Sequence, residues 1–253
     1  TGNQRYKDSV FSCYNQVNEQ IFMEYLEFER ILSAKRIQRY KDAANGDTRK
    51  AMALYRYNLR LSQEMFTIVS CFEVALRNAI DSLLVPSLGE DWLKDSVQDN
   101  GIFSNGRMNE TRKIIEKAFN RLNRQGNYSH SKLIAEMEFG VWKYMYSSLQ
   151  YRATGQCLLR AFPNKPRSSA AVQYNNTYIF NELDKVNSLR NRIAHHEPIC
   201  FRLHDAEIDT SYIINEYQKI QTLFSWMGID SHSMLYGLDH VQSVCAKINS
   251  LKV

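Results

Sequence analysis

Helical periodicity runs through almost the whole chain, and this feature most limits the folds available to it. Apolar residues return every three or four positions, whereas strand-like alternation is weak throughout. The 253 residues include only 10 Gly and 4 Pro, and such scarcity suits long helices. We therefore predict an all-α fold of about eight helices. We expect one domain over residues 1–253, with an N-terminal helix within 1–30 and C-terminal helices within 199–253.

The predicted helices are separated by short polar, Gly or Pro segments. They cover Ser9–Arg30, Ala34–Ala44, Arg49–Leu84, Asn109–Arg124, Ser131–Tyr151, Tyr178–His196, Glu207–Trp226 and Ser233–Leu251. Ser33 is expected to cap the second helix, and Pro86 with Gly89 to end the third. The inner face of the third helix is predicted to hold Leu59, Phe66, Val69, Leu76, Ile80 and Leu83.

Charge and cysteine content narrow the functional classes only partly. Lys and Arg exceed Asp and Glu by 32 to 27, a net charge of +5, which permits an anionic partner such as RNA. The five cysteines are scattered, which favours a reducing compartment. No apolar run is long enough for a membrane helix, so we expect a cytoplasmic protein. The sequence lacks a phosphate loop, a G-x-S-x-G elbow and zinc-ligand spacing, so we expect no metal and no cofactor.

The most informative segment is Asn187-Ser-Leu-Arg-Asn-Arg-Ile-Ala-His-His-Glu-Pro198. Pro198 cannot continue a helix, so the two histidines are predicted to lie at a helix C-terminus, whose negative dipole end stabilises an imidazolium. A titratable imidazole beside Arg190 could transfer protons in phosphoryl chemistry, while the guanidinium neutralises charge on phosphate oxygens.

Helix geometry sharpens this hypothesis. Arg190 projects into the apolar stripe of its helix and therefore needs a buried anion, for which we predict Glu73, supported by Arg77. In a regular helix Arg190 and His195 differ by about 140° in direction and lie about 7.5 Å apart along the axis. They can therefore act together only if the helix distorts or a second copy supplies one group. Asn191 shares the face of His195.

Each feature also has an ordinary structural explanation. Glu73 and Arg77 would form an ion-pair stripe, His196 a helix cap, and the Arg/His cluster a helix-end anion site. Two further basic clusters could follow a nucleic-acid backbone or simply be solvated helix faces. The residues predicted to contact RNA are Arg36, Arg39, Lys113, Lys117, Arg121 and Arg192.

Four stretches resemble one known family. Leu189–Pro198 is similar to the R-x4–6-H motif of HEPN domains and, more narrowly, to the Abi-like (abortive infection) proteins of bacterial phage defence. The other stretches are Leu32–Asp47, Leu54–Ile80 and Glu136–Trp142, so the resemblance covers region 31–198. It implies an all-α HEPN-type fold and a metal-independent endoribonuclease.

In that resemblance Arg190 and His195 match the motif's Arg and His, and Asn191 matches its polar position. His196 would be a supporting residue. Because the chain carries one motif, the resemblance implies a homodimer. The alternatives are an RNA-binding module that does not cut, and a protein-interaction module held by a protein or RNA antitoxin.

Overall fold

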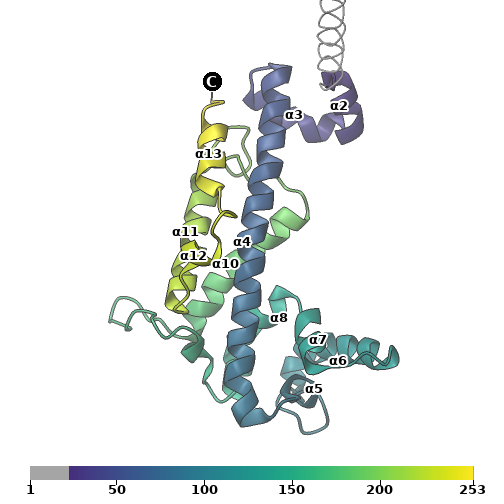
Figure 1. Cartoon of the computed structure of the whole chain (residues 1–253), viewed down its shortest axis with the longest axis vertical. Helices are drawn as coiled ribbons and strands as arrows, with labels where there is room; N and C mark the ends of the chain where they lie inside the picture. Colours follow the sequence, from purple (N-terminus) through teal and green to yellow (C-terminus); the bar gives the residue numbers. More distant parts are fainter. Residues whose placement is uncertain (1–22, 253) are drawn as a thin grey trace, which may run out of the picture. The chain divides into compact units, whose positions relative to one another are not determined.

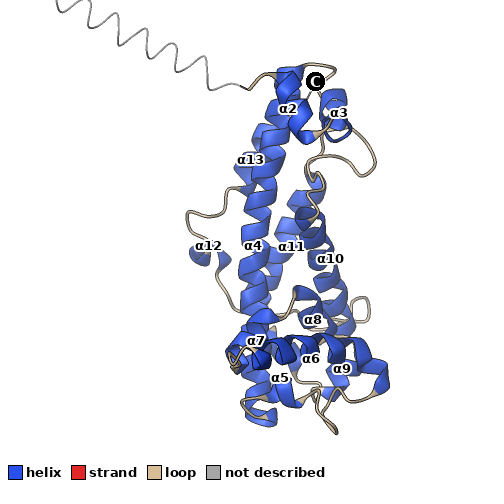
Figure 2. Cartoon of the chain, turned by 90° about the vertical axis from the view of Figure 1, so that its right-hand side faces the viewer, coloured by secondary structure: helices blue, strands red, loops and turns tan. Residues whose placement is uncertain are grey.

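The computed structural model describes residues 23–252. Every regular element in this range is helical, with twelve α-helices, eight of them at least seven residues long (Figure 2). The nearest approach to a strand among these residues is an isolated bridge between Phe201 and Ile208. The all-α prediction is therefore confirmed for the described range.

The helices follow one another as labelled in Figure 1. Their bounds are α2 (Tyr25–Leu32), α3 (Ala34–Ala43), α4 (Thr48–Leu88), α5 (Trp92–Asp95), α6 (Asn109–Arg124), α7 (His130–Glu136), α8 (Phe139–Tyr144), α9 (Ser148–Ala153), α10 (Asn176–Ala194), α11 (Ser211–Trp226), α12 (Ser231–Met234) and α13 (Val241–Asn249). Two short 3-10 turns lie at Gly106–Met108 and Leu158–Ala161.

The chain forms two compact units. The first contains described residues 23–60, 200–210 and 244–252, and the second contains 61–199 and 211–243. The single domain expected over residues 1–253 stays a prediction. Arg36 and Arg39 belong to the first unit, and Arg190 and His195 belong to the second.

An aromatic cluster forms the core of the first unit. The Tyr40 ring lies edge-on to Tyr55, with centroids 5.1 Å apart, and to Phe201, with centroids 5.0 Å apart. Arg39 covers Phe201 at 4.7 Å from the ring centroid and donates hydrogen bonds to the main-chain oxygens of Arg202 and Asp205. These contacts fix the 201–205 loop.

The second unit is built around α10, which packs against α8, α9 and α11. Helix α6 packs on α5 and α7. The largest fully buried side chains of this unit include Phe72 of α4, Trp92 of α5, Trp142 of α8 and Phe224 of α11. Burial of such large apolar surfaces is the main stabilising contribution to a helical core.

The long helix begins where the sequence predicts, and its predicted inner face is confirmed in part, since Val69, Leu76 and Ile80 are buried. Asp47 caps it, accepting a hydrogen bond from the Lys50 amide at 3.0 Å. Leu59 and Phe66, predicted to face inward, are 47% and 46% exposed. The buried face also holds residues that were not predicted to lie there: Leu54, Leu61, Met65, Ile68, Phe72 and Leu84. Apolar residues lie on several sides of α4, so its packing partners decide which face is covered.

Pro86 does not end α4, contrary to the prediction. It lies inside the helix, which continues to Leu88 and stops at Gly89, whose φ is +94°. A proline removes a single backbone donor, which one more turn of helix can tolerate near its end. The left-handed backbone at Gly89 is what terminates it.

Two other predicted helices are interrupted. Ser131–Tyr151 is divided into α7, α8 and α9, because Met137 and Glu138 are extended, with ψ of 130° and 158°. Ser233–Leu251 is divided into α12 and α13, with Gly237 at φ +73° between them. By contrast, Asn109–Arg124 is confirmed at both ends as α6.

The described range covers only the end of the predicted helix Ser9–Arg30, where α2 begins at Tyr25. Residues 9–22, with Cys13, lie outside that range. The other four cysteines, Cys71, Cys157, Cys200 and Cys245, are free thiols. Within the described residues no helix has both the length and the hydrophobicity required to span a membrane.

Candidate functional site

Helix α10 presents the motif residues from a well-anchored frame. The Asn175 side chain caps its start by accepting a hydrogen bond from the Tyr178 amide at 3.0 Å. The predicted apolar stripe is buried over its whole length and consists of Ile179, Leu183, Val186, Leu189 and Ile193. Arg190 and Asn191 follow Leu189 directly and are half-buried.

The helix ends at Ala194 in a Schellman motif. The His196 amide donates to the Ile193 carbonyl and the Glu197 amide to the Arg192 carbonyl, each at 2.9 Å. His196 takes the left-handed conformation, with φ of +56°. This motif satisfies carbonyls that a helix end otherwise leaves unpaired. It places His195 at the C-cap position, directly before the reversal of the chain.

Arg192 fastens this helix end to the segment that follows. Its guanidinium donates to the Pro198 carbonyl at 3.0 Å, pairs with the Glu197 carboxylate at 3.3 Å and lies 5.1 Å from the Tyr212 ring centroid. These contacts give Arg192 a structural role at the end of α10. Its predicted contact with RNA stays a prediction.

Arg190 is linked to the long helix through electrostatics. Burial raises the pKa of the Glu73 carboxyl above its ordinary value, the Arg190 and Arg77 guanidiniums oppose this shift, and the Glu138 carboxylate adds to it. Among the described residues no carboxylate lies within 4.0 Å of Arg190, whose Nη1 donates to Asn191 Oδ1 at 3.5 Å. Glu73 and Arg190 therefore sense each other's charge without a direct ion pair.

Two features of this cluster were not predicted from the sequence: the presence of Glu138, and the burial of an unpaired donor of Arg77. Glu138 was not predicted, because it is distant in sequence from both α4 and α10 and only the fold brings its charge toward Glu73. Arg77 was predicted, but its Nε is buried without a hydrogen-bond partner. A buried donor of this kind costs free energy unless a ligand or water satisfies it.

In a regular α10 the side-chain directions of Arg190 and His195 differ by about 140°. The helix stays regular through Ala194, so the distortion that would turn them together is absent from α10. His195 is exposed, and its imidazole makes no hydrogen bond or ion pair with any described residue. The other arrangement derived from helix geometry, in which a second copy supplies one of the groups, stays a prediction.

The other predicted basic residues are dispersed. Arg121 pairs with Glu136, and Lys113 pairs with Glu110 at 3.2 Å on the exposed side of α6. Lys117 lines a groove beside α8. In the first unit the Arg36 amide donates to the Ser33 cap at 3.4 Å. Among the described residues, no group of three or more His, Cys, Asp or Glu side chains could hold a metal ion.

Comparison with known proteins places the chain in a family. The model of the Abi-like protein family matches residues 20–200, which include α4, α8 and the whole of the Arg190–His195 segment. No curated protein and no solved structure matches the chain significantly. The family match covers well over half of the sequence, and we conclude that this chain belongs to the Abi-like protein family.

Proposed function

We propose that this protein is a metal-independent endoribonuclease of the HEPN type that acts in abortive infection, the bacterial defence against phage, or as a toxin. Membership of the Abi-like family implies the defence role. The observation that supports the nuclease is that one helix carries both an exposed His195 at its capped end and a half-buried Arg190 five residues earlier. The negative charge of the Glu73 carboxylate interacts favourably with the positive charge of the Arg190 guanidinium.

In this mechanism the ribose 2′-oxygen is the nucleophile. His195 removes the 2′-hydroxyl proton, the oxygen bonds to the adjacent phosphorus, and the bond to the 5′-oxygen breaks. A second imidazole, or His195 after its proton gain, delivers a proton to that leaving oxygen. The products are a 2′,3′-cyclic phosphate and a 5′-hydroxyl.

Arg190 stabilises the negative charge that develops on the phosphoryl oxygens in the transition state. Asn191 accepts from the Arg190 guanidinium and so helps to orient it. Because the proton carrier and the cation are side chains of this protein, the mechanism requires no metal. A homodimer would let His195 of one copy meet Arg190 of the other.

The direct test is cleavage by the His195→Ala variant. Loss of a general acid/base costs about 10²–10⁴ in rate, so cutting of single-stranded RNA should fall by that factor, followed by gel electrophoresis of labelled fragments. His232→Ala is the matched control, because it changes another exposed histidine, in α12. Cleavage by the wild type should persist in EDTA. Equal rates for the two variants would exclude the role of His195.

A non-catalytic RNA-binding module is the second candidate. The separation of Arg190 from His195 within one chain favours it, because each could then bind phosphate without reacting. Such a protein would bind RNA with steep salt dependence and release no cyclic phosphate. A stable complex with a protein or RNA antitoxin, without RNA cleavage, would instead indicate an interaction module.

A further inference from the structure

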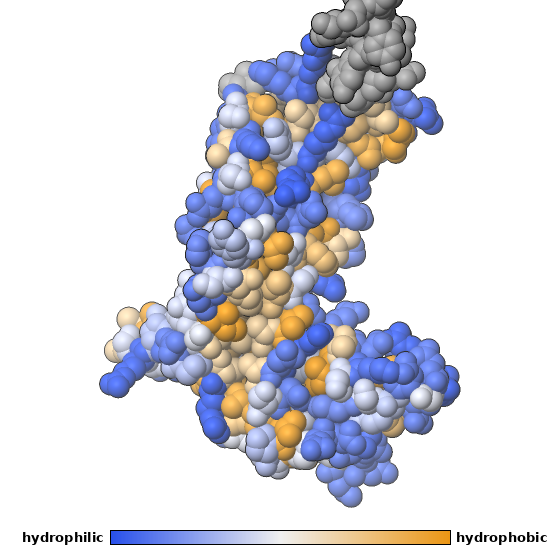
Figure 3. All heavy atoms as spheres, viewed as in Figure 1, coloured by the Kyte–Doolittle hydropathy of each residue, from blue (hydrophilic) through white to orange (hydrophobic). Residues whose placement is uncertain are grey.

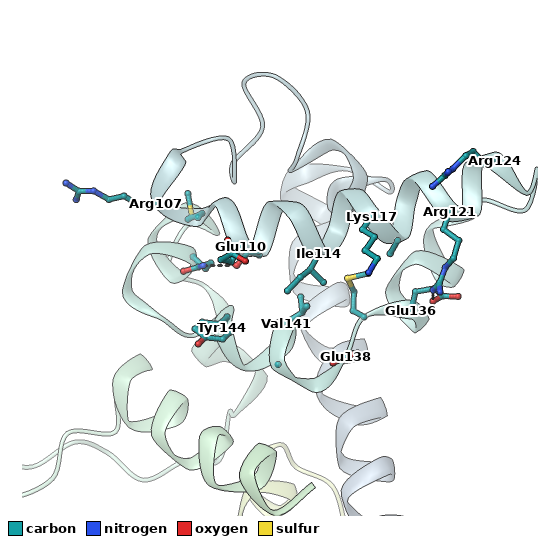
Figure 4. A pocket seen from close by; sticks show the side chains of 16 residues that line it. Arg107, Glu110, Ile114, Lys117, Arg121, Arg124, Glu136, Glu138, Val141 and Tyr144 are labelled. Atoms are coloured by element: carbon teal, nitrogen blue, oxygen red, sulfur yellow. Dashed lines mark hydrogen bonds and ion pairs between the residues drawn. The ribbon is translucent and has the colours of Figure 1, made fainter. Parts of the chain in front are cut away.

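A groove runs between α6 and α8 in the second unit. Its volume is about 710 Å³. Figure 4 shows Ile114 and Lys117 on the α6 side and Val141 and Tyr144 on the α8 side. The groove combines exposed cations with an apolar floor, two properties that do not occur together on an ordinary solvated helix face.

Three cations along this groove have no anionic partner. Arg107, Lys117 and Arg124 line it, and among the described residues none of them has a carboxylate within 4.0 Å. Figure 4 places Arg107 near one end, Lys117 in the middle and Arg124 at the other end. Lys117 and Arg124 are seven residues apart, about 10 Å along the helix. This row of unpaired charge matches a linear polyanion.

Three acidic residues line the groove: two of them are paired with other cations, and the third, Glu138, is outnumbered by the three unpaired cations. Glu136 is paired with Arg121, and Glu110 is paired with Lys113. Both carboxylates are thus neutralised by other cations. Figure 3 shows that the surface over α6, at the lower right, is largely hydrophilic.

The floor offers a surface on which bases can stack. Ile114 and Tyr144 are each 47% exposed although they are apolar or aromatic. The Tyr144 ring makes an edge-type contact with Phe180, with ring centroids 5.7 Å apart, and the Lys143 ammonium lies over the Tyr144 ring at 4.6 Å from its centroid, which leaves the opposite face for a base. Aromatic rings stack on any base, but only where the bases are not already paired and stacked in a duplex. The occupant that fits both the cations and the floor is single-stranded.

One residue connects the groove to the candidate catalytic cluster. Glu138 lines the groove, and its carboxylate acts on Glu73, which also senses Arg190. We propose that the α6–α8 groove binds single-stranded RNA, with Arg107, Lys117 and Arg124 contacting phosphates and Tyr144 stacking on a base. This proposal rests on the proposed nuclease function.

The test measures RNA binding in a background that cannot cut. The full-length His195→Ala protein is titrated into a labelled single-stranded RNA, and fluorescence anisotropy is followed at several salt concentrations. Adding Lys117→Gln and Arg124→Gln should weaken binding about tenfold and lower the slope of log K against log salt by about 1.4, since each single-strand phosphate contact contributes about 0.7. Both side chains are exposed, so the fold should survive.

Two further variants make the test specific. Lys132→Gln removes an exposed cation of the same unit outside the groove, and it should leave affinity and slope unchanged. Tyr144→Leu keeps an apolar side chain but removes the ring, so it should weaken binding about fivefold or more at an unchanged salt slope.

The outcomes separate this proposal from the nuclease. If RNA binding depends on the groove residues but the wild type never cleaves RNA, the groove proposal stands and the nuclease proposal is rejected. If the wild type cleaves RNA but the Lys117→Gln/Arg124→Gln variant binds RNA as tightly as the Lys132→Gln control, the nuclease proposal stands and the groove proposal is overturned. Absence of RNA binding, or capture of an acidic peptide in preference to RNA, would also overturn the groove.

Discussion

At the scale of single residues, the negative charge of Glu73 has different effects on stability and on the proposed activity. Its pKa is raised chiefly by burial, and the guanidiniums of Arg190 and Arg77 only partly oppose this effect. The folded protein therefore binds the Glu73 proton more tightly than the unfolded chain does. Stability from this group is present below the unfolded pKa, near 4.5, and is lost as pH rises through the higher folded value.

We accordingly predict that Glu73→Gln leaves the free energy of unfolding at pH 7 unchanged or slightly higher. The same change removes the negative charge that faces Arg190, so cleavage should fall by about tenfold to 10²-fold through misplacement of the guanidinium. Urea denaturation at pH 4 and pH 7 checks the first part, because only the wild type should lose stability from this group over that interval. A large loss of stability with full activity would contradict this account.

The sequence could identify Glu73 because Arg190 projects into an apolar stripe, and a buried cation needs an anion. It could not identify Glu138, whose extended backbone breaks the predicted helix Ser131–Tyr151 and whose position depends on how α8 packs. Periodicity describes a helix by its own pattern, whereas the side that is buried depends on partners far along the chain. Leu59 and Phe66 were misplaced for the same reason.

At the scale of the element, the sequence predicts roughly where α10 ends but not the backbone conformation at its end. Pro198 indicates that the helix must stop, and it does so four residues earlier. The left-handed conformation lies at a histidine and not at a glycine, so no residue type in this segment indicates it directly. Capping by Ser33, in contrast, follows from local side-chain chemistry and is confirmed by the hydrogen bond that its side chain accepts from the Arg36 amide.

We predict that His196→Gly stabilises the protein by up to about 1 kcal/mol, because glycine adopts positive φ without steric cost. The Schellman hydrogen bonds and the position of His195 should persist, so the cleavage rate should change less than twofold. His196→Val, a β-branched residue at the same φ, should be destabilising. Thermal and urea unfolding measure both effects. A loss of cleavage in the folded glycine variant would instead give His196 a chemical role.

At the scale of the whole molecule, the question is whether one copy contains a complete site. Helix α10 is regular through Ala194, so Arg190 and His195 point in directions about 140° apart. In the proposed homodimer, His195 of each copy lies beside Arg190 of the other, and twofold symmetry makes the two sites equivalent. The expected homodimer is thus a requirement of the proposed chemistry as well as an implication of the HEPN resemblance.

Mixing two inactive variants tests this requirement. Arg190→Ala and His195→Ala should each be inactive alone. If subunits exchange at random, half of the dimers are mixed, and one of the two sites in each mixed dimer carries both intact side chains. The mixture should therefore recover about a quarter of wild-type activity. Recovery should require exchange and should disappear when each variant is crosslinked to itself before mixing. A site completed within one chain predicts no recovery, because no chain in the mixture carries both Arg190 and His195.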